Sequence, residues 1–209
     1  MNRRQHMKNL LLTVFWILIP LLFFAQNADI DILRQINLNR NKDFDSFFRA
    51  VTHSAGPVAF AVPLLLLLAA RIKKNQKLKR KAIVMVMSVL TAVVITTTLK
   101  YTINRPRPFE TYSFIEKVTS GGSPSFPSGH TTDAFVLAAA LSLAFRRWYI
   151  IGPAYLWAVA IAYSRMGLGV HYPVDVLVGI LIGSGAALLW HLLYLREEKA
   201  RKEKQNKKV

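Results

Sequence analysis

Six apolar runs, each long enough to cross a lipid bilayer, set the first constraint on this fold. A spanning helix needs about 20 mostly apolar residues, because the hydrocarbon core holds no water to satisfy an open backbone. Most charged residues lie between the runs. We therefore predict an all-α, polytopic membrane bundle of six transmembrane helices that forms a single domain over residues 1–209. The predicted spans lie near residues 9–25, 54–72, 82–99, 129–146, 148–164 and 174–195.

The distribution of Lys and Arg predicts how these spans are oriented. The chain has a net charge of +17 and 28 Lys and Arg residues. With the N-terminus in the cytoplasm, the inside segments hold three, seven, two and seven of them, which is 19 of the 28. Cytoplasmic loops favour Lys and Arg, so we predict that both termini, including the basic tail 196–209, are cytoplasmic. We expect the first run to remain uncleaved, because no small-x-small site follows it.

The first external segment, residues 26–52, alternates apolar and charged side chains at helical spacing. Ile30, Leu33 and Ile36 are followed by a second apolar series that begins at Phe44. This pattern predicts one or two amphipathic helices. Two placements remain open: the segment either lies at the membrane interface or packs on the outer rim of the bundle.

Three basic side chains stand near the predicted external ends of the apolar runs. Lys100 ends the third run, Arg107 follows it in a loop rich in Pro and Gly, and Arg165 follows the fifth run. Arg can bind two phosphate oxygens in a fork, while Lys acts as a point charge. A lone cation here would more simply extend toward lipid headgroups. Three cations beside histidines instead favour a phosphate site.

The tetrapeptide from Pro127 to His130 marks the start of the fourth run. A helix N-terminus offers free backbone N–H groups and a positive dipole end, which together bind anions. Ser128 can cap the helix or donate to a phosphate oxygen, and Gly129 allows a ligand to approach the backbone. His130 then falls in the first turn. Taken alone, the pattern favours an ordinary capped helix with a partly buried histidine.

His171 and Asp175 form the most specific pair in the sequence. They are four residues apart at the predicted start of the sixth helix, where Pro173 suits the first turn. The carboxylate can accept a hydrogen bond from one ring nitrogen, which leaves the lone pair of the other free to attack. A His–Asp pair can also be structural, but an ionisable group at the mouth of an apolar helix is by default functional.

Together these residues resemble the three signature motifs of the type 2 phosphatidic acid phosphatase superfamily. The segment from Lys100 to Arg107-Pro108 is similar to the first motif, and residues 127–130 to the second. Ser164-Arg165, His171 and Asp175 are similar to the third. The resemblance implies a membrane lipid phosphatase with six helices that needs no metal and no other cofactor.

The resemblance also implies a role for each motif residue. His171 would be the nucleophile and form a phosphohistidine, and Asp175 would orient it. His130 would protonate the leaving oxygen and then activate the water that frees the phosphate. The phosphoryl oxygens would be held by Lys100, Arg107, Ser128, Gly129 and Arg165.

Two further ionisable residues have open interpretations. Asp133 lies one turn after His130 and can hydrogen-bond that histidine and raise its pKa, or it can cap locally against Thr131 or Thr132. His53, near the outer end of the second run, is better interpreted as a supporting or interfacial residue than as a catalytic one.

We therefore expect an enzyme of lipid metabolism that hydrolyses a lipid phosphate or diphosphate at the outer leaflet of a bacterial cytoplasmic (inner) membrane. Candidate substrates are undecaprenyl pyrophosphate, phosphatidylglycerol phosphate, phosphatidic acid and a lipid A phosphate. The alternatives are a lipid phosphotransferase and a lipid-binding or transport protein without turnover. Intact His130, His171 and Asp175 argue against the last. The expected partners are the lipid substrate and the membrane, with no nucleic acid and no obligate protein partner.

Overall fold

The computed structural model describes residues 27–206, and this part of the chain is helical with no strand. The first predicted span, near residues 9–25, lies outside the described residues. A helical segment over residues 27–38 opens the described chain, and we call it the N-terminal helical segment. The later elements are η1 (Lys42–Phe44), α2 (Asp45–His53), α3 (Ala55–Ile72), α4 (Gln76–Ile103), α5 (Pro108–Thr111), α6 (Gly129–Phe145), α7 (Trp148–Gly167) and α8 (Pro173–Asn206).

The long helices follow the predicted apolar runs but extend beyond some of them. α4 begins at Gln76 because the side chain of Asn75 accepts a hydrogen bond from the N–H of Leu78, 3.0 Å away. It ends where Asn104 adopts a left-handed conformation with φ of 49°. α8 continues through the charged tail to Asn206. α4 outlasts its apolar run because caps, and not hydropathy, set its two ends.

Three stretches of the described chain are long and apolar enough to cross a membrane: Lys42–Ile72, Gln76–Thr111 and Pro173–Asn206. Gly129–Phe145 is a shorter apolar helix. The count of six spans stays a prediction.

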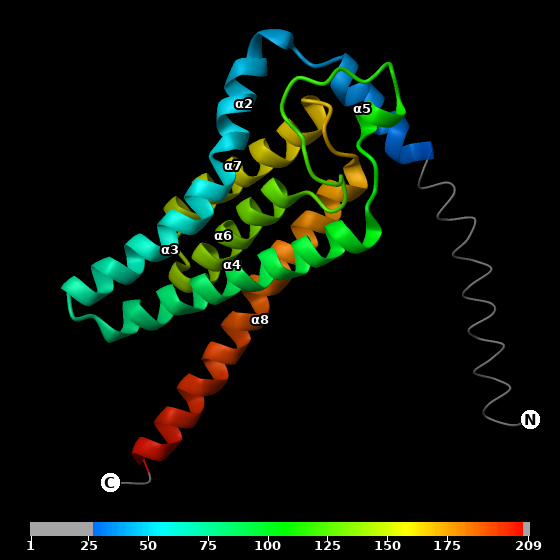
Figure 1. The fold of residues 1–209 in the computed structure, drawn as a ribbon. Helices are drawn as coiled ribbons and strands as arrows, with labels where there is room; N and C mark the ends of the chain where they lie inside the picture. The colour runs from blue at the N-terminus through cyan, green and yellow to red at the C-terminus, as the bar shows by residue number, and fades with distance from the viewer. Residues whose placement is uncertain (1–26, 207–209) are drawn as a thin grey trace, which may run out of the picture.

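α6 forms the centre of the bundle and packs against α3, α4, α7 and α8 (Figure 1). Seven of the ten residues from Thr131 to Ala140 have apolar side chains and are buried, as are Thr131 and Thr132, while Asp133 is half-buried. A helix that is apolar on all sides belongs in an interior, and α6 occupies one. Its alanines also keep the neighbouring helices close.

α6 and α8 approach each other closely at two glycines. A Cβ at Gly183 would lie 2.6 Å from the carbonyl oxygen of Thr132, and one at Gly179 would lie 2.8 Å from that of Ser128. Small residues let membrane helices bring their backbones together. The contact places the first turn of α6 beside the first turns of α8, where the N–H of Ser128 donates to the carbonyl of Asp175 over 3.0 Å.

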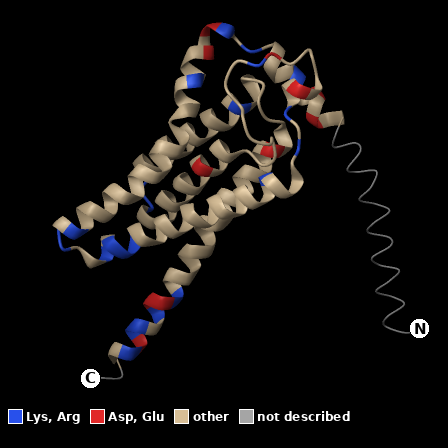
Figure 2. Ribbon diagram, in the orientation of Figure 1, with Lys and Arg blue, Asp and Glu red and all other residues tan. Residues whose placement is uncertain are grey.

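The two ends of the bundle differ in character. Figure 2 shows Lys and Arg gathered at the α3–α4 turn and along the far part of α8, where acidic residues are interleaved. At the other end, the long connection between α4 and α6 and the turn between α7 and α8 lie beside the N-terminal helical segment (Figure 1). The motif residues all belong to this second end.

We predict that Gly183→Ala destabilises the protein, because the added methyl group has to push apart two helix backbones. The expected cost is about 1–3 kcal/mol, seen as a lower melting temperature in detergent. Gly185→Ala is the matched control, since nothing lies within 4 Å of a Cβ built there. Equal melting temperatures for the two variants would contradict the proposed close contact.

Candidate active site

The turn between α7 and α8 carries His171, and its backbone is tightly held. The carbonyl of Arg165 accepts hydrogen bonds from the N–H groups of Val170 and His171, at 3.2 and 3.1 Å. Gly169 has a φ of 74°, and a Cβ there would lie 2.2 Å from the carbonyl oxygen of Glu116. Only glycine fits a left-handed position with this contact. The turn is therefore pinned by both α7 and the external loop.

The imidazole of His171 stands between a carboxylate and a guanidinium. Its Nδ1 lies 3.5 Å from Oδ2 of Asp175, and its Nε2 lies 3.4 Å from Nη1 of Arg107. Asp175 also accepts hydrogen bonds on Oδ2 from the N–H of Tyr172 at 3.0 Å and from the hydroxyl of Ser125. This arrangement favours the tautomer with the proton on Nδ1. The lone pair of Nε2 then faces the guanidinium of Arg107.

Burial keeps the His171 ring neutral. The side chain is 1% exposed, and this burial lowers its pKa to about 3, although the neighbouring Asp175 acts in the opposite direction. The positive charges of Arg165 and Arg107 add to the lowering. A neutral imidazole retains the lone pair that a nucleophile requires.

Arg107 and Lys100 are directed by backbone carbonyls of the external loop. Arg107 is 4% exposed, and it donates from Nε to the carbonyl of Ser123 and from Nη1 to that of Val170, both at 2.8 Å. Lys100 donates to the carbonyl of Pro124 over 2.6 Å. Neither cation extends toward lipid. Carbonyl partners hold the side chains in place without cancelling their charge.

Arg165 is the most deeply buried of the three cations. It is 2% exposed and donates from Nη1 to the hydroxyl of Thr52 over 3.0 Å. Its Nε, like Nδ1 of His171 and Nε2 of His191, is buried with no hydrogen-bond partner among the described residues. Such a nitrogen is costly unless an acceptor reaches it.

The first turn of α6 supplies the second motif. The hydroxyl of Ser128 pairs with that of Thr131 at 2.8 Å and makes no side-chain cap. A Cβ built on Gly129 would lie 3.8 Å from Cε of Lys100, so the lysine stem passes over this glycine. His130 is half-buried, and the charges of Arg165, Arg107 and Lys100 act on it.

The structure therefore brings the predicted site residues to one place, from α4, the external loop, α6, α7 and the start of α8. His53 lies close enough for its charge to act on His130. Asp133, in contrast, makes no hydrogen bond to His130 among residues 27–206. Its carboxylate faces α3, because a Cβ built on Gly56 would lie 3.9 Å from Oδ2 of Asp133. The pairing of Asp133 with His130 therefore gains no support from these contacts.

Four residues of this region were not identified as functional from the sequence. Arg105 donates from Nη1 to Asp175 at 2.7 Å and from Nη2 to Asp29 at 2.8 Å. Ser125 contacts the same Asp175 carboxylate. Asn37 bridges the carbonyls of Glu116 and Gly167, at 3.0 and 2.9 Å. Pro106 and Pro108, which both follow Arg105 in the sequence, were a signal for its fixed direction, whereas no pattern marked Asp29 or Asn37.

The external loop is also tied down at its exposed edge. Glu116 accepts from Arg40 and from Lys42, each at 2.8 Å. Hydrogen bonds from Lys42 and Arg40 lower the pKa of the Glu116 carboxyl. This edge joins the loop to the chain that follows the N-terminal helical segment.

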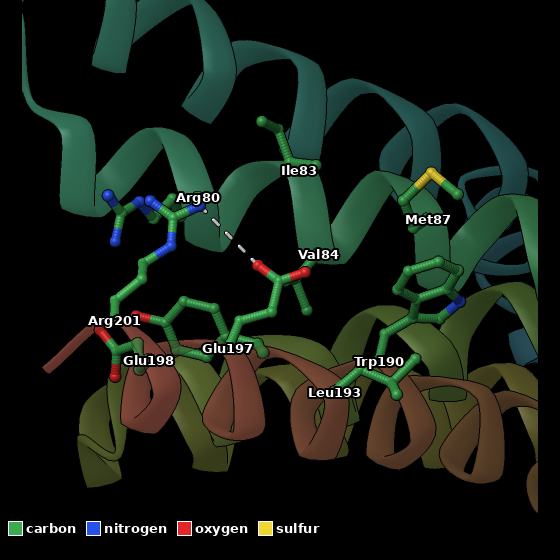
Figure 3. A pocket seen from close by; sticks show the side chains of 10 residues that line it. Arg80, Ile83, Val84, Met87, Trp190, Leu193, Glu197, Glu198 and Arg201 are labelled. Atoms are coloured by element: carbon green, nitrogen blue, oxygen red, sulfur yellow. Dashed lines mark hydrogen bonds and ion pairs between the residues drawn. The ribbon is translucent and has the colours of Figure 1, made fainter. Parts of the chain in front are cut away.

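A cavity lies far from these groups, between α4 and α8 (Figure 3). Arg80, Met87, Trp190 and Arg201 are among its lining residues. Arg80 precedes Lys100 by 20 residues on one continuous helix, which corresponds to about 30 Å. The cavity is thus separate from the candidate active site. No group of three or more His, Cys, Asp or Glu side chains in residues 27–206 is placed to hold a metal ion.

Comparison with known proteins places these residues in a family context. The model of the PAP2 superfamily matches residues 81–199. An undecaprenyl-diphosphatase of Sulfolobus acidocaldarius is 31% identical over 188 residues, which are 86% of this chain and 86% of that protein. The undecaprenyl-diphosphatase BcrC of Bacillus subtilis is 32% identical over 149 residues, 69% of this chain and 74% of that protein.

A solved structure shares the fold. The crystal structure of the first transmembrane PAP2-type phosphatidylglycerolphosphate phosphatase from Bacillus subtilis superposes with a TM-score of 0.67. The two sequences are 25% identical, and the match covers 88% of this chain and 96% of the other. The PAP2 match begins at residue 81, so Asp29 and Asn37 lie outside the matched region.

We predict that acid weakens the fold partly through His171. An unfolded histidine takes a proton near pH 6.5, whereas the buried ring does so only near pH 3. Stability from this group is therefore complete above pH 6.5 and is lost as the pH falls toward 3. Between pH 7.5 and pH 5 the loss is about 2 kcal/mol.

Melting temperatures of the wild type and of His171→Gln, measured in detergent at both pH values, check this prediction. The variant is expected to lose less stability on acidification than the wild type. The same pH dependence in both proteins would show that the His171 ring is not held neutral by the fold.

Proposed function

Because the chain belongs to the PAP2 superfamily and is a phosphatase of that superfamily, we propose that it removes the terminal phosphate of a membrane lipid through a phosphohistidine on His171. The observation that carries this proposal is the convergence of Nε2 of His171 with the buried guanidinium of Arg107, 3.4 Å away. Lys100 and Arg165 lie close enough to Arg107 for its charge to act on both of them. One nucleophilic nitrogen beside three cations is the inventory that phosphoryl transfer requires.

In the first step, Nε2 of His171 attacks the terminal phosphorus and a P–N bond forms. The P–O bond to the lipid breaks, and His130 donates a proton to the departing oxygen. Nδ1 keeps its proton, which points at Asp175, so the carboxylate stabilises the positive charge that grows on the ring. In the second step, water attacks the phosphorus, His130 takes its proton, the P–N bond breaks and inorganic phosphate leaves.

We assign Lys100, Arg107 and Arg165 to the phosphoryl oxygens, together with the hydroxyl of Ser128 and the backbone at Gly129. Charge on those oxygens would be met by cations that carbonyl groups and the hydroxyl of Thr52 hold in place beforehand, so little reorganisation is needed. The buried Nε of Arg165, which has no acceptor among the described residues, supports an anion as its partner.

We propose undecaprenyl diphosphate as the first substrate to examine, because the relative that aligns with 86% of this chain is an undecaprenyl-diphosphatase. Phosphatidylglycerol phosphate follows, on the strength of the structural neighbour. Release of inorganic phosphate from a panel of these lipids, phosphatidic acid and lipid A would identify the substrate. Transfer of phosphate to a second lipid without release would instead indicate a phosphotransferase, and no turnover would leave a binding or transport protein.

We further propose that residues 1–209 form one membrane domain in the bacterial cytoplasmic membrane, with both termini in the cytoplasm and the site on the outer side. The support is the separation seen in Figure 2, where the Lys- and Arg-rich turn and tail stand opposite the site. We propose no obligate protein partner.

We predict that His171→Asn lowers phosphate release by a factor on the order of 10³ or more, because the variant has no nucleophilic nitrogen at this position. Substrate labelled in its terminal phosphate should label the wild-type protein transiently and leave the variant unlabelled. His191→Asn is the matched control: it changes a buried histidine far from the site, near Lys81 and Arg146, and is expected to keep activity.

The same phosphate-release assay can test whether the reaction requires a metal ion. Activity in excess EDTA is expected to equal activity without it, since we assign charge stabilisation to the three cations. Full activity of His171→Asn would overturn the assignment of the nucleophile, and loss of activity in EDTA would overturn metal independence.

The orientation can be checked by cysteine labelling, because the chain contains no cysteine of its own. Ser113→Cys lies on an exposed turn at the site end, and Lys77→Cys lies on the exposed start of α4 at the other end. In intact cells made permeable only at the outer membrane, a membrane-impermeant thiol reagent should label the first variant. It should label the second only after lysis. The reverse pattern would place the site in the cytoplasm.

A further inference from the structure

Arg105 is held on three sides at the edge of the candidate active site. Its two terminal nitrogens donate to different carboxylates, Asp175 at 2.7 Å and Asp29 at 2.8 Å. Its guanidinium lies 3.7 Å from the ring centroid of Tyr172, which is a cation–π contact. A guanidinium whose two terminal nitrogens both donate hydrogen bonds has little freedom to rotate. The position of the Asp29 carboxylate therefore restricts, through Arg105, the position of the Asp175 carboxylate.

Asp29 is the fixed end of this arrangement. It is 4% exposed, and its Oδ1 accepts a hydrogen bond from the N–H of Val174 at 2.8 Å. Val174 is the second residue of α8, and its N–H is one of the donors that a helix start leaves without an internal partner. A residue 145 positions away thus caps the helix that carries Asp175.

Asp29 also belongs to a buried stripe on the N-terminal helical segment. Asp29, Leu33 and Asn37 recur every four residues and are 4%, 0% and 0% exposed. Leu33 packs with Ile115 and Tyr172, and Asn37 bonds the carbonyl of Gly167 at the end of α7. One face of the segment therefore rests on the turn that carries His171.

The carboxylate of Asp175 is held in place by hydrogen bonds to both of its oxygens. Arg105 holds Oδ1, while Ser125 and the N–H of Tyr172 hold Oδ2, the oxygen that faces Nδ1 of His171. The N–H of Tyr172 is bonded in the manner of a capping box. With its partners on both oxygens, the carboxylate cannot rotate away from the imidazole.

We propose that Asp29 is a positioning residue for phosphoryl transfer: through Arg105 it sets the carboxylate of Asp175, which in turn orients the His171 ring. This inference rests on the proposed function, in which His171 is the nucleophile. Asp29 touches neither the His171 ring nor the phosphate-binding cations directly. Its effect should therefore appear in the rate of the chemical step and not in the binding of the lipid.

A double-mutant cycle on the full chain in detergent tests this proposal. The probe is undecaprenyl diphosphate labelled in its terminal phosphate, or the lipid of the panel that the wild type hydrolyses fastest. Asp29→Asn is expected to lower kcat about tenfold to a hundredfold, the range for losing one charged hydrogen bond. KM should change by less than about twofold, as for an interaction realised in the transition state.

The cycle distinguishes positioning from simple support of the fold. In an Asp175→Asn background, Asp29→Asn should cause no further loss, because its effect passes through the missing carboxylate. Asp31→Asn is the matched control, since Asp31 is exposed on the same helical segment, and it should keep wild-type kcat. If Asp29→Asn does not fold, Asp29→Glu keeps the charge, moves the carboxylate by one methylene and enters the same cycle.

Each outcome decides the matter. If Asp29→Asn leaves kcat unchanged, the positioning role is rejected while the proposed function stands. The same holds if Asp29→Asn lowers kcat by the same factor in the wild-type and Asp175→Asn backgrounds. A rise in KM without a fall in kcat also rejects it. If the Asp175→Asn rate is too low to measure, the kcat and KM of the single variants decide. A wild type that hydrolyses no lipid of the panel rejects the proposed function and this inference together.

Discussion

The close contact between α6 and α8 is the constraint on which the site depends. Gly179 and Gly183 let the two backbones meet closely, because neither residue has a side chain to hold them apart. The starts of both helices then lie side by side, and the N–H of Ser128 reaches the carbonyl of Asp175. In a membrane, apolar side chains gain little by facing each other instead of lipid, so packing of small residues has to supply this association. The second and third motifs meet because of it.

The cations are held in a manner that preserves their charge. Arg107 and Lys100 donate to carbonyl groups at Ser123, Val170 and Pro124, and Arg165 donates to a hydroxyl. Carboxylates would have neutralised them. Of these four basic residues, Arg105 is the one that pairs with carboxylates, those of Asp29 and Asp175. The four basic residues are thus divided between an electropositive site and the support of the carboxylate beside the histidine.

The N-terminal helical segment extends the site beyond the region shared with the superfamily model. Asp29 and Asn37 reach the start of α8 and the end of α7, the two elements that flank His171. The external loop is fixed to the same segment through Glu116. A turn that carries a reactive side chain needs such fixed points, because small displacements of a reacting group cost large factors in rate.

The local helical elements of this protein can be predicted from its sequence. Apolar runs predicted α3, α4, α6, α7 and α8, because burial in lipid requires long uninterrupted runs. Spacing along one helix also predicted that Asp175 would face His171. Contacts between distant segments were decided by the tertiary structure alone: that Arg105 and not Arg107 would hold Asp175, and that Asp29 would cap α8. Such contacts leave no periodic mark in a sequence, because each depends on how several helices and a long loop pack at once.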